Sequence, residues 1–324
     1  MKVITSMQTH ANNYLNERRG LGFALISPGR SIIHFAHYVD TLNCTRPLTV
    51  EVMAVWAKQD KSKSNNPLTW ARRLKVLRPF TRYLQQFEPG TEVPDKSVFG
   101  SVSHRLTPHI YTEDEVLDLL KAARQLAPEN GLRSATYETL FGLIASTGLR
   151  VSEAVHLLNH DVDLKQGVLT IRKTKFAKSR YVPLHPTTTK ALRNYCLLRN
   201  SYVKIISGTA FFIGSRGQRL GQPLSLSSVR QTFANLRSQL NWINRGAHDT
   251  PRIHDLRHTF VVRRLLLWHS QNIDIDQMML SLATYVGHSA VTNTYWYLSS
   301  VPELMTLAGN KFELFTQAQE NEHV

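Results

Sequence analysis

A cluster of prolines and glycines early in the chain limits the fold more than any other sequence feature. The segment EPGTEVPDKSVFGSVSHRLTP, residues 88–108, holds three prolines and two glycines. Because proline lacks a backbone donor and glycine favours turns, we expect no regular element there. The 324 residues are also too many for one ordinary hydrophobic core. The sequence therefore predicts two domains, 1–87 and 109–301, joined by a linker over 88–108.

The net charge narrows the class of partner. The formal charge is +15 and the isoelectric point is near 10.0, which favours a polyanion because phosphate binding releases counterions. The N-terminus, MKVITSMQTHANNYL, lacks the apolar run of a secretory signal, and no stretch is long enough to span a membrane. Cys44 and Cys196 are too few for a disulfide framework or a cysteine-based zinc site. We expect a soluble, cytoplasmic protein that binds nucleic acid and no membrane.

A basic segment closes the first domain. Residues 61–87 contain seven basic side chains and no acidic one. Leu74, Leu77, Leu84 and Phe87 recur near one helical face, and Pro79 should kink or split that helix. A solvated charged face is the alternative, but it would normally carry carboxylates as well. We predict a helical domain that binds nucleic-acid phosphates through Arg72, Arg73, Lys75, Arg78 and Arg82.

The second domain is predicted to be mainly helical, with one β element. YTEDEVLDLLKAAR begins with Thr112 and Glu115 at the spacing of a capping box. GVLTIRKTKFAKSRYVPLHP has β-branched runs at 168–171 and 181–184 around a basic turn, which predicts a hairpin. The fold class is therefore mainly α with a small β-hairpin or sheet. The hairpin carries four basic side chains, for which solvation is the ordinary interpretation: Lys173, Lys175, Lys178 and Arg180. Lys173, Lys178 and Arg180 are candidate contacts to nucleic acid.

Three clusters far apart in sequence suggest one site assembled by folding. STGLRVSEAVHL places Arg150 three residues before Glu153, whose carboxylate could orient the guanidinium. IHDLRHTF places His254 and Arg257 on one helical face. YVGHSAVTNTYWYL adds a histidine and three tyrosines, namely His288, Tyr285, Tyr295 and Tyr297. Each cluster also has a structural interpretation: a surface ion pair, a helix cap, a core histidine or packed aromatic rings.

Together these clusters resemble the tyrosine recombinase family, also called phage integrases. STGLRVSE resembles the box of the family's first arginine, which implies that role for Arg150 and a supporting role for Glu153. TKFAKSRYVPL resembles the lysine hairpin and implies that Lys175 is catalytic. Phe176 stands where many relatives carry glycine, so Lys178 remains the second choice.

The resemblance also assigns the remaining site residues. HDLRHTF resembles the His-x-x-Arg box and gives His254 and Arg257. GHSAVTNTYWY resembles the box with the third basic position, His288, and the nucleophile. In the family the tyrosine follows that histidine by nine residues, and 297 − 288 = 9, so the resemblance selects Tyr297.

The implied reaction is site-specific cleavage and rejoining of double-stranded DNA through a covalent 3′-phosphotyrosine. The arginines would neutralise phosphate oxygens, the histidines would hydrogen-bond them, and Lys175 would protonate the leaving 5′ oxygen. The resemblance implies no nucleotide cofactor, because the phosphotyrosine conserves the bond energy, and no metal, because the arginines supply the positive charge. The resemblance implies a homotetramer on paired sites, with or without a partner recombinase, in which a C-terminal helix and tail, 302–324, is exchanged in trans. TYWYL followed by SSVPELM resembles recombinases of transposons and other mobile elements more than the Xer proteins that resolve chromosome dimers. The implied product is integration, excision or resolution of such an element.

Three alternatives stay open. His254 and His258 have the spacing of a zinc pair, with His288 as a third ligand, so a metallohydrolase is conceivable. The chain could be a DNA-binding protein without catalytic activity. It could also be a monomeric enzyme of the type IB topoisomerase kind, which uses similar residues.

Overall fold

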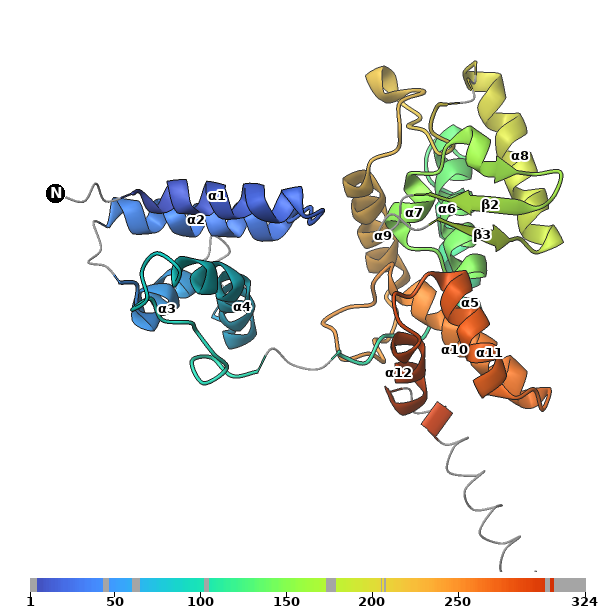
Figure 1. Ribbon diagram of the computed structural model, residues 1–324. Coiled ribbons are helices and arrows are strands. Elements are labelled where there is room, and N and C mark those ends of the chain that lie inside the picture. Colours follow the sequence, from blue (N-terminus) through green and yellow to red (C-terminus); the bar gives the residue numbers. More distant parts are fainter. Residues whose placement is uncertain are drawn as a thin grey trace, which may run out of the picture. The chain divides into compact units, whose positions relative to one another are not determined.

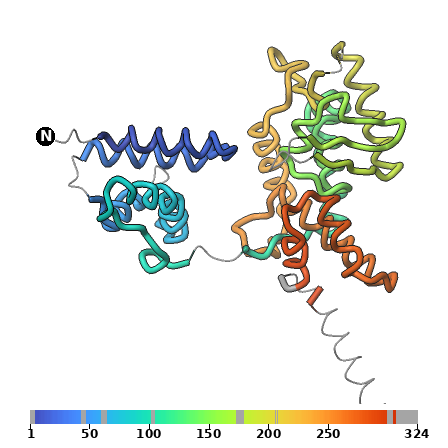
Figure 2. The backbone as a smooth tube through the Cα atoms, viewed as in Figure 1, coloured from blue at the N-terminus to red at the C-terminus, as the bar shows by residue number. Residues whose placement is uncertain are grey.

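The computed structural model of the chain describes residues 5–42, 47–59, 65–101, 105–172, 179–204, 206, 208–300 and 304–305. It contains two compact units, Met1–Arg105 and Leu106–Val324. Figure 1 shows the helices of each unit and the strands of the C-terminal unit, and Figure 2 traces the backbone in the same view. Each unit has its own hydrophobic core.

The N-terminal unit is built from helices packed around aromatic and aliphatic side chains. Phe35 and Trp56 meet edge to face, with ring centroids 5.2 Å apart. Asn66 caps the last of these helices by accepting from the backbone N–H of Leu68, and Pro67 occupies its first turn, where no donor is needed. The helices are α1 (Met7–Gly20), α2 (Ile26–Thr41), α3 (Val50–Lys58) and α4 (Pro67–Leu84).

Helix α4 matches part of the predicted pattern. Leu74, Leu77 and Leu84 are buried as expected. The helix is not split at Pro79, since it is continuous from Pro67 to Leu84. The placement of Phe87 on the buried face was wrong, because its side chain is 55% exposed. The helix ends before this residue and the chain turns there, so helical periodicity no longer applies.

Much of the segment predicted as a linker packs against the N-terminal unit. Thr91 is buried, and the backbone N–H of Glu92 donates to the carbonyl of Leu48 at 2.9 Å. Phe99 contacts Trp70 at 5.4 Å between ring centroids. Irregular chain up to residue 101 therefore belongs to this unit, whose boundary falls after Arg105.

The second unit is mainly helical, as predicted. Thr112 and Glu115 form the predicted capping box at the start of its first helix. Helix α6 packs against α5, α8 and α10. The helices are α5 (Glu113–Arg124), α6 (Leu132–Thr147), α7 (Val151–Val155), α8 (Pro186–Tyr202), α9 (Leu226–Leu240), α10 (Asp255–Ser270), α11 (Ile275–Val286) and α12 (Thr292–Ser300), with 3-10 turns η1 (Asn159–Asp161) and η3 (Gly217–Arg219).

The predicted hairpin lies within a small antiparallel sheet of order β1-β2-β3. Strand β2 (Val168–Ile171) has the predicted bounds, whereas β3 (Arg180–Pro183) begins one residue earlier than expected, and β1 is Val162–Asp163. Ile171 is the register partner of Arg180. The fold class predicted from the sequence is thereby confirmed.

Helices α10, α11 and α12 share a separate hydrophobic cluster in which Tyr297 is buried. This cluster brings Phe260 of the HDLRHTF motif together with Tyr297 of the YVGHSAVTNTYWYL motif. No helix within the described ranges has the length and apolar character needed to cross a membrane.

Candidate active site

Arg150 lies between two helices and is held on both sides. It precedes α7 in an extended conformation, and its Nη1 donates to Glu153 Oε1 at 2.7 Å. Its Nη2 donates to the carbonyl of Gly287, which ends α11, also at 2.7 Å. The side chain keeps 34% of its surface exposed. The predicted contact with Glu153 is present, and the guanidinium is fixed while one face stays accessible.

Arg257 is a buried cation with spare hydrogen-bonding capacity. Only 2% of its surface is exposed, and its Nη1 donates to the carbonyl of Gly148 at 2.7 Å. Its buried Nη2 has no hydrogen-bond partner in the described part of the chain. Burial and then the charge of Arg150 lower its pKa to about 10, so it remains protonated at neutral pH. A buried donor of this kind normally has a partner, and an anion would supply one.

Both arginines are held by carbonyls of helix-terminating glycines. Gly148 and Gly287 have φ of +64° and +74° and end α6 and α11. A side chain at Gly148 would also come within 2.6 Å of the ring of Phe260. This left-handed conformation turns each carbonyl toward an arginine. Glycine is favoured at both positions because it has no Cβ and adopts a positive φ readily.

Two histidines lie one helical turn apart beside these arginines. His254 precedes α10 and His258 follows within it, with perpendicular rings 4.9 Å apart. Burial, followed by the charges of Arg257 and Arg252, lowers the pKa of His254 to about 4. Burial, followed by neighbouring His254 and then by the charge of Arg252, lowers the pKa of His258 to about 2. Both rings are therefore neutral at pH 7 and can accept a hydrogen bond.

The three tyrosines have different surroundings. Tyr285 donates to the carbonyl of Pro183 at 3.1 Å, and Tyr295, 38% exposed, donates to Asp276 Oδ1 at 2.9 Å. The hydroxyl of Tyr297 is instead 2.7 Å from His258 Nδ1. Tyr297 also stacks on the ring of His288 at 6.3 Å between centroids. Of the three, Tyr297 alone has contacts with these histidines in the described part of the chain.

The remaining histidine of the motifs, His288, lies between α11 and α12 and contacts one residue of each helix. His288 Nδ1 lies 2.7 Å from the hydroxyl of Thr294, and its backbone N–H donates to the carbonyl of Ala283 at 2.8 Å. The fold thus gathers residues from three distant motifs: Arg150, Glu153, His254, Arg257, His288 and Tyr297.

Comparisons with known proteins identify the family. Residues 110–303, more than half of the chain, match the model of the phage integrase family. This chain belongs to the phage integrase family. It is a tyrosine-type site-specific recombinase.

The recombinase has relatives along nearly its whole length. It is 35% identical to the integrase/recombinase y4rB of Sinorhizobium fredii, over 96% of this chain and 98% of that protein. It is 30% identical to the tyrosine recombinase XerC of Thermodesulfovibrio yellowstonii, over 72% of each.

Solved structures share the fold at low identity. The Tn1549 transposon integrase, in complex with transposon right end DNA, has a TM-score of 0.66 at 15% identity and covers 95% of this chain and 100% of that chain. A lambda integrase dimer bound to a COC′ core site has a TM-score of 0.57 at 17% identity and covers 89% of this chain and 97% of that chain.

The hairpin residues divide into two groups. Lys173, Lys175 and Lys178 lie outside the described residues. Arg180, predicted to contact DNA, has its guanidinium directed inward to Glu153, and its side chain is 9% exposed. A hollow of about 650 Å³ is lined by Arg150 and Glu153 and by the end of β2.

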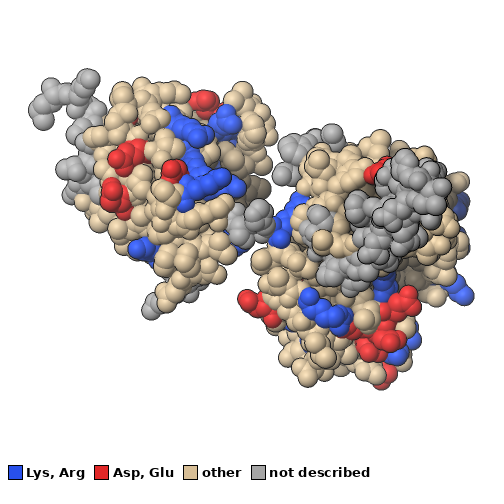
Figure 3. Space-filling view, turned by 90° about the horizontal axis from the view of Figure 1, so that it is seen from below, with Lys and Arg blue, Asp and Glu red and all other residues tan. Residues whose placement is uncertain are grey.

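The predicted DNA contacts on α4 also divide. Arg72, Lys75 and Arg82 are exposed. Arg73 stacks on Trp56 at 4.2 Å and donates to its carbonyl, while Arg78 donates to the carbonyl of Pro94 at 2.7 Å. Figure 3 shows groups of Lys and Arg on the surface of the molecule, with Asp and Glu among them.

His258 is the site residue that the motif comparison missed. The sequence indicated it only as half of a zinc pair with His254, and its contact with Tyr297 requires the packing of α12 against α10. Across the described residues, no group of three or more His, Cys, Asp or Glu side chains is arranged to hold a metal ion.

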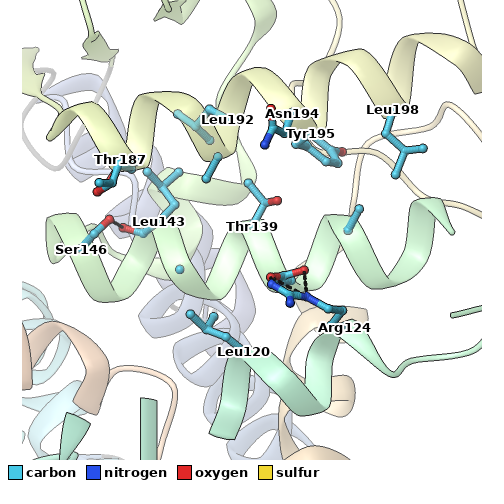
Figure 4. Close-up of a pocket in the computed structure, with 15 residues that line it drawn as sticks. Leu120, Arg124, Thr139, Leu143, Ser146, Thr187, Leu192, Asn194, Tyr195 and Leu198 are labelled. Atoms are coloured by element: carbon cyan, nitrogen blue, oxygen red, sulfur yellow. Dashed lines mark hydrogen bonds and ion pairs between the residues drawn. The ribbon is translucent and has the colours of Figure 1, made fainter. Parts of the chain in front are cut away.

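A second cavity, of about 480 Å³, lies between α5, α6 and α8 (Figure 4). The ion pair of Arg124 with Glu138 lies at its edge. None of the candidate catalytic residues lines it, so it is separate from the candidate active site.

Proposed function

We propose that this recombinase cleaves and rejoins double-stranded DNA through a covalent 3′-phosphotyrosine on Tyr297, in the movement or resolution of a mobile element. The observation that carries the proposal is the buried Nη2 of Arg257, which has no hydrogen-bond partner among the described residues, in a guanidinium that also interacts electrostatically with Tyr297. A phosphodiester would supply the missing acceptor. It would also receive the attack of the tyrosine.

The reaction would exchange one ester bond for another. The Tyr297 oxygen bonds to phosphorus as the bond from phosphorus to the 5′ oxygen breaks. Arg150 and Arg257 would offset the charge that builds on the non-bridging oxygens. His254 and His288 would hydrogen-bond those oxygens, and Lys175 would give its proton to the leaving 5′ oxygen.

His258 supplies an acceptor for the phenolic proton in this scheme. With the proton of its neutral ring on Nε2, Nδ1 accepts from the Tyr297 hydroxyl at the observed 2.7 Å. This hydrogen bond would orient the nucleophile before DNA enters and would receive or relay its proton during attack.

Glu153 would support the site by orienting Arg150. DNA would be tracked by the exposed face of α4, with Arg72, Lys75 and Arg82, and by the hairpin lysines Lys173 and Lys178. The match along nearly the full length of an integrase/recombinase favours the mobile-element role. We further propose a homotetramer on paired sites, joined through exchange of residues 302–324, with or without a partner recombinase.

The test uses a nicked duplex that carries DNA flanking the gene. On this substrate the wild-type protein should form an adduct that resists SDS. Tyr297→Phe should bind the duplex equally well and form none, whereas Tyr295→Phe should react normally because its hydroxyl contacts Asp276 instead. An adduct in Tyr297→Phe would refute the assignment. Relaxation of supercoiled plasmid by a monomer, without strand exchange between sites, would favour the topoisomerase-like alternative.

A further inference from the structure

Arg180, at the start of β3, is connected to three parts of the candidate site. Its Nη1 and Nη2 donate to the two oxygens of Glu153 at 3.1 and 2.8 Å. Its Nε donates to the carbonyl of Tyr285 at 2.8 Å. Strand β3 leads out of the lysine hairpin, Glu153 also binds Arg150, and Tyr285 lies three residues before His288.

Gly287 shows how closely the loop before His288 covers this guanidinium. A Cβ at Gly287 would lie 2.5 Å from Arg180 Nη1 and 2.6 Å from its central carbon. All three nitrogens of Arg180 have acceptors, and its side chain is 9% exposed. The guanidinium is therefore not directed toward a DNA backbone.

The charges of the three ionised groups decide what Arg180 contributes. Burial alone raises the pKa of Glu153, but hydrogen bonds and charge from Arg180, followed by Arg150, lower it to about 2. The carboxylate is thus ionised at neutral pH. Glu153 and Arg150 alone would sum to zero charge, and Arg180 restores one positive charge to the group.

We infer that Arg180 is a positioning residue for Arg150: it neutralises Glu153 so that the charge of Arg150 remains available to a phosphate. The guanidinium of Arg180 also binds both oxygens of Glu153. The Arg150 side chain therefore makes one hydrogen bond to Glu153 and one to the carbonyl of Gly287. This role rests on the proposed function and adds a residue that acts through Glu153 and Arg150, without contact to the phosphate or to Tyr297.

The test compares four variants in single-turnover cleavage and in DNA binding across salt concentrations. Arg180→Met should slow cleavage about 100-fold, as expected when one charge-stabilising contact is lost. Glu153→Gln combined with Arg180→Met should recover about tenfold of this loss, because removing the carboxylate returns a net positive charge. Arg180→Lys keeps the charge without the fork and should fall between wild type and Arg180→Met. Arg124→Ala removes an arginine from another ion pair with a glutamate and should react as wild type.

DNA binding separates positioning from phosphate contact. A contact to DNA would lower the slope of log affinity against log salt by about 0.9 when removed, whereas Arg180→Met should leave this slope unchanged. The inference is overturned if Arg180→Met has a reduced slope or cleaves DNA at the wild-type rate. It is also overturned if the double variant cleaves no faster than Arg180→Met.

Calorimetric titration with orthovanadate, a phosphate mimic, gives a readout that does not need cleavage. Arg180→Met should bind it at least tenfold more weakly than wild type, and the double variant should recover affinity. If the wild-type protein binds orthovanadate but forms no adduct with DNA, the proposed function is contradicted. The relative orthovanadate affinities of the variants would still test the role of Arg180. Equal vanadate affinity in all variants would overturn the inference.

Discussion

Helix α4 and the cluster around Tyr297 use cationic side chains in opposite ways. On α4, Arg72, Lys75 and Arg82 extend into solvent. In the candidate active site, Arg257 is buried and held by a backbone carbonyl, and Arg150 is half-buried between Glu153 and Gly287. Exposed cations can adapt to any phosphate and contribute affinity, whereas fixed cations are preorganised for the charge that develops during reaction. The comparison teaches that position and burial, more than charge, separate binding from catalysis.

Loss of the buried cation should have the largest effect. Arg257→Met keeps the length of the side chain but removes both charge and donors, so we expect cleavage to fall by roughly 10³-fold. Affinity for DNA should change less than tenfold, because the lost interaction matters most in the transition state. Single-turnover cleavage and fluorescence anisotropy measure the two quantities. An equal loss of affinity and rate would remove the distinction between the two regions.

Acid should destabilise the second unit through its neutral histidines. The folded-state pKa values of His254 and His258 lie below 6.5, so the unfolded chain binds more protons at lower pH. Stability should therefore be full above pH 6.5 and fall as pH drops toward 4, by up to about 1.4 kcal/mol per pH unit for each histidine. Denaturant unfolding at several pH values measures this slope.

His258→Asn and His258→Ala separate titration from hydrogen bonding. Both should flatten the pH dependence of unfolding, since neither side chain titrates. Asn can still offer an acceptor near the position of Nδ1, so it should retain more cleavage than Ala. Identical cleavage by the two variants would show that the contact with Tyr297 does not matter for the reaction.

The smallest effects should come from α4. Replacing Arg72, Lys75 or Arg82 by Ala should each lower the salt slope of DNA binding by about 0.9 and leave cleavage at saturating DNA unchanged. Arg73→Ala and Arg78→Ala are matched controls, because their side chains contact Trp56 and Pro94. These controls should lower thermal stability and leave the slope near the wild-type value. Equal slopes for all five variants would argue against a DNA-binding face on α4.

Features that depend on neighbouring residues could be predicted from the sequence. Thr112 and Glu115 form their capping box within one helical turn. Strand β2 follows its β-branched run, and Leu74 and Leu77 follow helical periodicity. The family motifs likewise indicated which side chains form the candidate active site, because the order and spacing of these motifs can be recognised in the sequence alone.

Which way a charged side chain faces was decided only by the tertiary structure. Arg180 and Tyr285 are 105 residues apart in sequence, and His258 and Tyr297 are 39 apart. Arg78 turns inward because the carbonyl of Pro94 lies beside it, although Lys75 and Arg82 on the same helix are exposed. A basic residue in a basic segment has the same sequence signature whether it meets a phosphate or a buried acceptor. The acceptor comes from a distant part of the chain, so folding alone distinguishes the two.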